Sequence, residues 1–238
     1  MGCLELDAYY SAAEFENDAL RILDDLFTRN DHAILCGGSM MYIDAVCRGI
    51  DNLPTISPEV RAECLEFYEK EGLEGITARL RALDPAYLLT ADLRNPRRLV
   101  HALEICLESG MPYSSLRTGT AKERPFAIRK YAIVPEREEM FARINRRVEL
   151  MMEQGLLEEA RRVYPLRHLN SLNTVGYKEL FRYIDGEWDL ATAVARIQKY
   201  TRVFAKKQLT WLKKSSGYTI LPTPSLPLLL STLDKNEK

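Results

Sequence analysis

Residues 52–119 constrain the fold most, because they carry helix signals and no strand signal. Ser57 can cap a helix that opens with Pro58 at its first position. Further helices are predicted over residues 73–83 and 96–109. A purely helical block of this length between two segments of mixed pattern predicts a helical insertion in an α/β protein.

Strand signals occur on both sides of this block. The apolar run from His32 to Cys36 ends in Gly37-Gly38 and predicts a buried parallel strand, followed by a helix over residues 39–47. The carboxyl end of such a strand is where α/β proteins bind ligands, although paired glycines also serve as a simple tight turn. Two further strands are predicted, at residues 126–134 and 218–221.

The remaining helices complete the predicted organisation. One starts after Ser11. Another runs from Arg137 to Tyr164, with Gly155 as an interruption that can divide it into two helices. The last two helices are expected at 175–184 and, after Asp189, up to about residue 214. We therefore expect four parts: a partial α/β core (1–51), a helical insertion (52–119), the remainder of the core with long basic helices (120–221) and a tail (222–238).

Composition excludes several classes of protein. The apolar and charged fractions, 46% and 28%, are those of an ordinary globular protein. The five cysteines are scattered without a Cys-x-x-Cys pair, which argues against a disulfide framework or a structural zinc site. No signal peptide and no apolar run of membrane-spanning length is present, so a cytoplasmic protein without membrane contact is expected.

The last long helix concentrates positive charge. Residues 196–214 include seven basic residues and no acid. Lys199, Arg202 and Lys206 share one helical stripe, whereas Tyr200 and Phe204, with Ile197 and Trp211, lie on the opposite face and are expected to anchor the helix. The pattern is equally compatible with anion binding and with a solvated surface.

Two smaller arginine clusters accompany it. Arg143 and Arg147 are one turn apart and can converge on a phosphate, or can form ordinary surface pairs with nearby glutamates. Arg94, Arg97 and Arg98 surround a helix start, where the macrodipole disfavours cations. That placement favours a polyanion such as RNA at this position.

Other catalytic signatures are absent from the sequence. The three histidines have no neighbours that would suggest a metal site or a nucleophilic triad. The sequence also contains no Gly-x-x-x-x-Gly-Lys-Ser/Thr phosphate loop.

Taken together, several separated stretches resemble the tRNA dimethylallyltransferase (tRNA isopentenyltransferase) family. In chain order these stretches are Ala8–Phe15, Leu35–Tyr42, Leu53-Pro54 with Pro58–Arg61, Asn95–Leu99 with Ala102–Glu104, Arg143-Ile144 with Arg147, Thr174–Glu179, and Thr201-Arg202 with Ala205–Leu212. The resemblance extends to about residue 221, and the ordered set is specific although each stretch alone is modest.

The resemblance implies a predominantly helical α/β fold with a P-loop-NTPase-like parallel-sheet core and a helical insertion that holds the tRNA anticodon arm. It implies transfer of a dimethylallyl group from dimethylallyl diphosphate to N6 of the adenosine 3′-adjacent to the anticodon, with that adenosine flipped out. Mg²⁺ and a monomeric enzyme are also expected.

Site residues follow from matching positions. Arg147 resembles the family arginine that contacts the diphosphate. The positions that resemble tRNA contacts are Ser39, Arg61, Arg97, Arg98, His101, Asn173, Thr174, Val175, Gly176, Tyr177 and Lys178. Lys199, Arg202 and Lys206 are a hypothesis for the lining of the same channel, without a residue-level match.

Departures from the family pattern matter as well. The family's first strands, its glycine-rich phosphate loop and its general-base aspartate would precede Met1, so no catalytic residue is assigned and the chain alone is expected to be inactive. Ser39 stands where a threonine is usual, and His101 where an arginine is usual, which removes a permanent charge.

Two other functions stay open. A non-catalytic tRNA-binding paralogue would keep the RNA surface and lack the phosphate loop. An adenylate isopentenyltransferase would act on a free nucleotide, but a long helical insertion with an arginine-flanked helix has no use on so small an acceptor.

Overall fold

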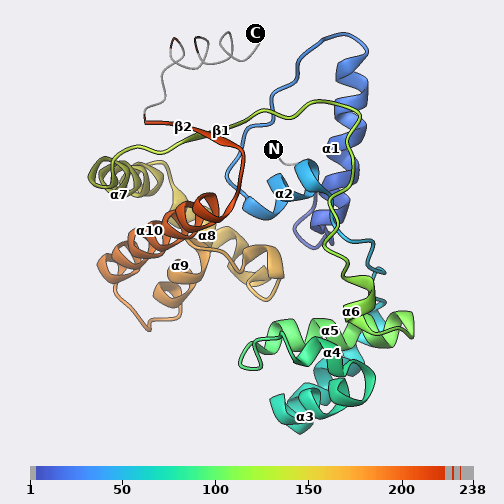
Figure 1. The fold of residues 1–238 in the computed structure, drawn as a ribbon. Coiled ribbons are helices and arrows are strands. Elements are labelled where there is room, and N and C mark those ends of the chain that lie inside the picture. Colours follow the sequence, from blue (N-terminus) through green and yellow to red (C-terminus); the bar gives the residue numbers. More distant parts are fainter. Residues whose placement is uncertain (1–3, 223–226, 228–230, 232–238) are drawn as a thin grey trace. The chain divides into compact units, whose positions relative to one another are not determined.

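The structure, a computed structural model, describes residues 4–222 together with residues 227 and 231. The predicted tail therefore lies mostly outside the described residues. The chain divides into two compact units. We call Ala12–Ala33 with Asp44–Arg124 the all-helical unit, and Met1–Ser11, Ile34–Ile43 and Pro125–Lys238 the strand-containing unit. Figure 1 labels their helices and strands.

The all-helical unit holds the predicted insertion and, in addition, the first helix. Its elements are α1 (Ala12–Phe27), most of α2 (Met40–Arg48), α3 (Pro58–Leu83), α4 (Pro85–Leu88), α5 (Pro96–Ser109) and α6 (Tyr113–Leu116). The predicted helices at these positions are confirmed.

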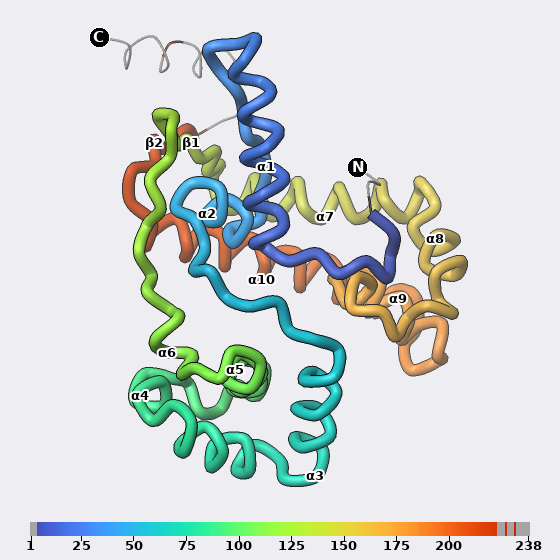
Figure 2. The backbone as a smooth tube through the Cα atoms, turned by 90° about the vertical axis from the view of Figure 1, so that its right-hand side faces the viewer, coloured from blue at the N-terminus to red at the C-terminus, as the bar shows by residue number. Residues whose placement is uncertain are grey.

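Local signals explain the ends of α3 and α5. The Ser57 hydroxyl accepts a hydrogen bond from the Val60 N–H at 3.4 Å, with Pro58 at the first helical position. Gly72 interrupts α3 with φ 63° and ψ −162°, so the two predicted helices meet at a kink there. Figure 2 shows α3 change direction along its length. Gly110 ends α5 in the left-handed conformation.

The packing of α3 against α5 forms the core of the insertion. Four large side chains and one cysteine in this contact are inaccessible to solvent: Ile76, Leu80, Leu99, Leu103 and Cys64. Burying each leucine or isoleucine contributes roughly 1.5–3 kcal/mol. Burial also raises the pKa of the Cys64 thiol to about 11, so this cysteine is uncharged and unreactive at neutral pH.

Asp84 connects three short segments around this core. Its side chain accepts hydrogen bonds from the Tyr87 N–H at 3.0 Å and from the Ser114 N–H and hydroxyl at 2.6 and 2.7 Å. The residue is only 1% exposed, and these donors compensate for its lost hydration. The carboxylate therefore joins the end of α3 to α4 and α6.

A second buried carboxylate holds α1 in the same unit. Glu16 accepts hydrogen bonds from Arg124 at 2.7 Å, from Lys122 at 3.1 Å and from the Ile50 N–H at 3.0 Å. The Arg124 guanidinium also donates to the carbonyls of Ala45 and Val46 at 2.8 Å, at the carboxyl end of α2. Burial raises the pKa of Glu16, but these hydrogen bonds outweigh it and lower the pKa below its ordinary value.

The strand-containing unit has a two-stranded parallel sheet. Strand β1 (Lys130–Ile133) pairs with β2 (Tyr218–Leu221) from Lys130 opposite Tyr218 to Ile133 opposite Leu221. Because the strands are parallel, the chain must cross over between them. The crossover consists of α7 (Arg137–Glu153), α8 (Leu156–Val163), two short 3₁₀ helices (Tyr164–Leu166 and Asn170–Leu172), α9 (Tyr177–Ile184) and α10 (Leu190–Lys214).

A separate core lies among these crossover helices. Its buried members come from α7, α8, α9 and α10 and include Val148, Leu156, Ala160, Leu180, Ala193 and Ile197. Gly155, with φ 98°, separates α7 from α8 as the sequence predicts. Asp189 caps α10 by accepting a hydrogen bond from the Thr192 N–H at 2.6 Å.

The predicted strand at His32–Gly38 is wrong. Residues 33–38 lie in no helix or strand, and Ile34 is 90% exposed. An extended segment becomes a strand only when another strand pairs with it. Within the described residues, β1 and β2 pair with each other and this segment has no partner strand.

Arg124→Ala should lower the free energy of unfolding by about 3 kcal/mol or more, because Glu16 would stay buried with too few donors. Lys122→Ala is the matched control and should cost about 1 kcal/mol or less, because the Lys122 side chain is half exposed. Chemical denaturation of both variants tests this ranking. The wild type should also lose stability as the pH falls through the lowered pKa of Glu16, and Glu16→Gln should show less of that loss.

Candidate functional site

The predicted site residues are distributed over both units. Arg61, Arg97, Arg98 and His101 belong to the all-helical unit. The others belong to the strand-containing unit: Ser39, Arg147, Asn173, Thr174, Val175, Gly176, Tyr177, Lys178, Lys199, Arg202 and Lys206. We describe the groups within each unit in turn.

Glu104 lies between two of the predicted residues of the all-helical unit. Its carboxylate is 3.9 Å from the Arg61 Nε and 3.4 Å from the His101 Nδ1, and the residue is 7% exposed. Arg61 comes from α3 and His101 from α5, so this one buried acid holds cation-forming side chains of two helices near each other. Both side chains are partly exposed and can contact a ligand.

Arg97 and Arg98 lie at the amino end of α5. The Asn95 side chain accepts a hydrogen bond from the Arg98 N–H at 3.3 Å, which caps the helix. Both arginine side chains are exposed, and the first turn of α5 contains no acidic residue. Two positive charges thus add to the positive end of the helix dipole, which is the arrangement that an anion would stabilise.

In the strand-containing unit, α7 orients two cations of α10. The Asn145 side-chain oxygen accepts a hydrogen bond from Arg202, and the Phe141 ring lies 6.0 Å from Arg202 and 5.5 Å from the Lys206 ammonium. Cation–π contact and an amide oxygen hold these side chains without cancelling their charge. Arg202 and Lys206 therefore form a positive surface oriented by α7, to which exposed Lys199 belongs by helical spacing.

The prediction that Tyr200 and Phe204 anchor α10 is wrong. These side chains are 36% and 47% exposed, whereas Ala193 and Ile197 on the same face are buried. The reason is that the core among α7, α8 and α9 includes only the first part of α10. The spacing of apolar residues identifies a face of a helix, but not how far the neighbouring helices cover it.

Arg147 lies apart from this cationic surface. It follows Asn145 by two residues, so its side chain leaves α7 about 200° around the helix from that of Asn145. The residue is exposed, and it does not line the cavity described below. Its assignment to a diphosphate stays a prediction.

The Gly37-Gly38-Ser39 segment lies against α10. The Gln208 side chain donates a hydrogen bond to the Gly38 carbonyl at 2.6 Å. A Cβ atom at Gly38 would lie 2.6 Å from the Gln208 Nε2, so the end of the flexible Gln208 side chain would have to move if any other residue stood at this position. Ser39 is exposed just before α2, and its carbonyl accepts from the Ile43 N–H at 3.0 Å.

Residues 173–178 form the entry to α9. Gly176, with φ 109°, donates its N–H to the Glu179 carboxylate at 2.7 Å, so the chain itself supplies an anion at this helix end. The Tyr177 hydroxyl donates to Glu159, and that bond together with burial raises the pKa of Tyr177 to about 12. Ligand contacts from this segment therefore fall mainly to its exposed residues, which are Asn173, Thr174, Val175 and Lys178.

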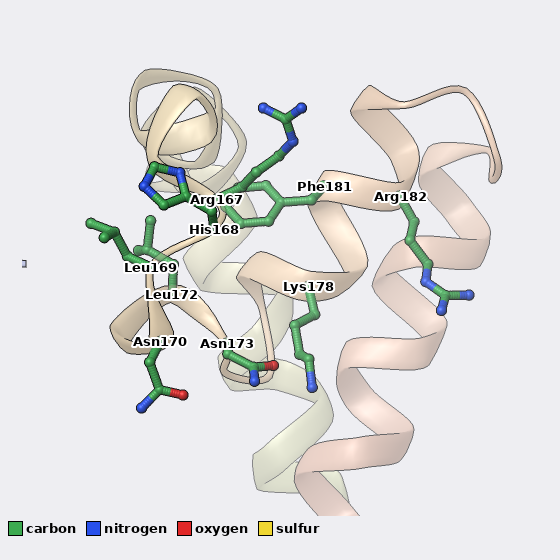
Figure 3. A pocket seen from close by; sticks show the side chains of 9 residues that line it. All are labelled: Arg167, His168, Leu169, Asn170, Leu172, Asn173, Lys178, Phe181 and Arg182. Atoms are coloured by element: carbon green, nitrogen blue, oxygen red, sulfur yellow. The ribbon is translucent and has the colours of Figure 1, made fainter. Parts of the chain in front are cut away.

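A cavity of about 410 Å³ adjoins this segment (Figure 3). Its lining residues come from the loop before α9 and from α9 itself: Arg167, His168, Leu169, Asn170, Leu172, Asn173, Lys178, Phe181 and Arg182. No carboxylate is among them. In Figure 3 the side chains of Asn173 and Lys178 extend to the same side of the cavity.

Sequence reasoning missed the residues that position the cations. Glu104 and Gln208 stand within stretches that the family resemblance covers, but neither has a local pattern that indicates its partner. Asn145 and Phe141 lie one turn apart on α7, and no local pattern around them indicates a contact with α10. A covariation signal between positions 145 and 202 would be the kind of observation that finds such a pair.

Comparison with known proteins gives a consistent result. The model of the IPP transferase family matches residues 1–215. The chain is 56% identical over 214 residues to tRNA dimethylallyltransferase 1 of Phocaeicola vulgatus, covering 90% of this chain and 71% of that protein. It is 57% identical over 208 residues to tRNA dimethylallyltransferase 2 of Porphyromonas gingivalis, covering 87% and 69%.

Solved structures agree with the fold. The tRNA isopentenylpyrophosphate transferase of Bacillus halodurans matches with a TM-score of 0.65 and 27% identity, over 99% of this chain and 75% of that one. A eukaryotic dimethylallyltransferase acting on tRNA matches with a TM-score of 0.75 and 20% identity, over 100% and 62%, and this match concerns the fold alone. The predicted P-loop-like α/β class with a helical domain is thereby confirmed.

Gln208→Ala should lower the free energy of unfolding by about 1 kcal/mol, because it removes the hydrogen bond to the Gly38 carbonyl, and Gly38→Ala should lower it by no more than this, because its Cβ displaces the same Gln208 amide. The double variant should lose no more unfolding free energy than the less stable of the two single variants, because both substitutions act on the same contact. Gly37→Ala is the matched control, because no atom lies within 4 Å of its added Cβ. Strictly additive losses in denaturation experiments would contradict the contact.

Proposed function

The chain belongs to the IPP transferase family, and we propose that it serves the transfer of a dimethylallyl group from dimethylallyl diphosphate to tRNA. The acceptor in this proposal is N6 of the adenosine 3′-adjacent to the anticodon. The observation that carries the proposal is the identity of more than half of the matched residues to proteins named tRNA dimethylallyltransferase, along nearly the whole chain.

The described geometry supports an RNA acceptor rather than a free nucleotide. Exposed cations occur in both compact units, at the start of α5 and on α10 with the loop before α9. A free nucleotide is small, whereas an RNA stem-loop presents a chain of phosphates that separate cationic groups can contact together. The adenylate isopentenyltransferase alternative gives no role to Arg97 and Arg98.

The proposed reaction is a substitution at the allylic carbon. The N6 amine forms a bond to that carbon while the carbon–oxygen bond to diphosphate breaks, and N6 then loses a proton. The leaving diphosphate gains negative charge, so cations placed at it stabilise the transition state more than the ground state. Arg147 is the residue that we assign to this group, and no residue of the chain is assigned as the base.

Magnesium would supply further positive charge for the leaving group. Among the described residues, no group of three or more His, Cys, Asp or Glu side chains is placed to hold a metal ion. Magnesium is usually held by one or two carboxylates together with substrate phosphates, so we assign it to the diphosphate in this proposal and name no ligand or step for it in the chain.

The proposed cellular setting is the cytoplasm, with a monomer as the acting form. Within the part of the chain that the structure describes, no helix combines the length and the apolar character that crossing a bilayer requires. The partner in this proposal is the anticodon arm of tRNA.

The direct test supplies dimethylallyl diphosphate with an anticodon-arm hairpin or with AMP as acceptor. We expect the 238-residue chain to bind the hairpin more tightly than a hairpin of scrambled sequence. Transfer by the chain alone should be negligible, because its sequence contains no phosphate loop to hold the donor. Prenyl product on AMP but not on RNA would refute the proposal, and binding without transfer in every longer form of the protein would favour the non-catalytic alternative.

Arg97→Ala and Arg98→Ala should each weaken binding of the hairpin and reduce the slope of log affinity against log salt by about 0.7 to 0.9, since each phosphate contact releases counterions. Arg81→Ala is the matched control, an exposed arginine in the last turn of α3. Fluorescence anisotropy at several salt concentrations measures both quantities. If the salt slopes of both variants equal that of Arg81→Ala, Arg97 and Arg98 do not belong to the RNA-binding interface.

A further inference from the structure

The cavity before α9 has a floor of buried apolar side chains and a rim of exposed charged and polar ones. Leu172 and Phe181 are buried beneath it, and the Phe181 ring contacts Tyr164 edge-on at 5.5 Å between centroids. The Ser171 hydroxyl donates to the Leu6 carbonyl at 2.6 Å, which ties the loop to another segment of the same unit. The rim side chains are exposed and polar: Arg167, His168, Asn170, Asn173, Lys178 and Arg182.

Aromatic rings position the two rim arginines. The Arg167 guanidinium lies 4.4 Å from the Tyr164 ring centroid, and the Arg182 guanidinium lies 4.8 Å from that of Trp188. The carboxylate near Arg182 is Glu187, at 3.8 Å, and both side chains of that pair are more than half exposed, so water screens it. A second acid, Asp185, accepts a hydrogen bond from the Tyr164 hydroxyl beneath Arg167, so the three cationic side chains of the rim outnumber the two acids near it.

The chemistry of the rim selects a phosphate ligand. Three permanent cations, an imidazole and two amides surround a cavity without a carboxylate. Arginine suits the bidentate geometry of phosphate oxygens, and amide N–H groups donate to the same oxygens. A cavity intended for an uncharged ligand would be lined mainly by apolar side chains, which this one is not.

The directions of the side chains favour a chain of phosphates over one compact anion. In Figure 3 the side-chain ends of Arg167, Lys178 and Arg182 extend to three different sides of the cavity. Side-chain ends that point apart suit the successive phosphates of a polynucleotide better than a single phosphate. The segment 173–178, which the family resemblance assigns to RNA, forms only one side of this rim.

We propose that the cavity formed by residues 167–182 binds consecutive backbone phosphates of the RNA, with Arg167 and Arg182 as contacts beyond the segment 173–178. This inference rests on the proposed function, which supplies the RNA. It extends the RNA-binding surface of the strand-containing unit to the loop after α8 and to the second turn of α9.

The test measures binding of the anticodon-arm hairpin to Arg167→Ala and Arg182→Ala at several salt concentrations. Each variant should bind roughly fivefold more weakly, and its salt slope should fall by about 1. Arg182→Lys should restore the slope because it keeps the charge, which a purely structural role of Arg182 would not predict. Arg161→Ala, at an exposed arginine of α8 outside the cavity, is the matched control.

Competition with inorganic diphosphate separates the two sources of phosphate. Arg167→Ala and Arg182→Ala could lose diphosphate binding while the salt slope of their RNA binding equals that of Arg161→Ala. In that case the cavity binds a small phosphate compound, and the RNA proposal is overturned. The RNA proposal is also overturned if both arginine variants show the same salt slope of RNA binding as Arg161→Ala and an unchanged diphosphate affinity. Neither result affects the prenyl-transfer and hairpin-specificity tests of the proposed function, so the two failures are distinguishable.

Discussion

The parallel pairing of β1 with β2 is the constraint on which the arrangement of the cationic helices depends. Parallel neighbours cannot be joined by a tight turn, so the chain between them must leave the sheet and return. In this chain the crossover is the whole α7–α10 segment. It returns α10 against α7, which brings Arg202 to Asn145 and Phe141 although these residues are far apart in sequence.

A common feature of the cations is that aromatic rings and amides hold them, not only acids. Arg202 and Lys206 lie over Phe141, Arg167 over Tyr164, and Arg182 over Trp188. A carboxylate partner neutralises a cation, whereas a ring face orients it and leaves the charge available to another anion. A chain with a formal net charge of −1 can in this way present strongly positive local surfaces.

The sequence predicted what depends on neighbouring residues. The caps at Ser57 and Asp189 and the helix ends at residue 109 and Gly155 depend on residues within one turn, and the structure has its helix ends at these places. Contacts between distant residues left no local signal. The partner of Gly38 is Gln208, and nothing around either residue identifies the other. The segment from His32 was predicted as a strand for the same reason, since its composition cannot show whether another strand lies beside it.

The partner of Arg202 has a consequence for the conditions in which this surface persists. An asparagine amide gains no proton when the medium becomes acidic, whereas an aspartate in its place would be discharged and would release the guanidinium. The orientation of the α10 residue Arg202 against α7 therefore does not depend on a titrating group at position 145. The cationic side of α10 keeps its shape from neutral into mildly acidic solution, as long as the helices remain folded.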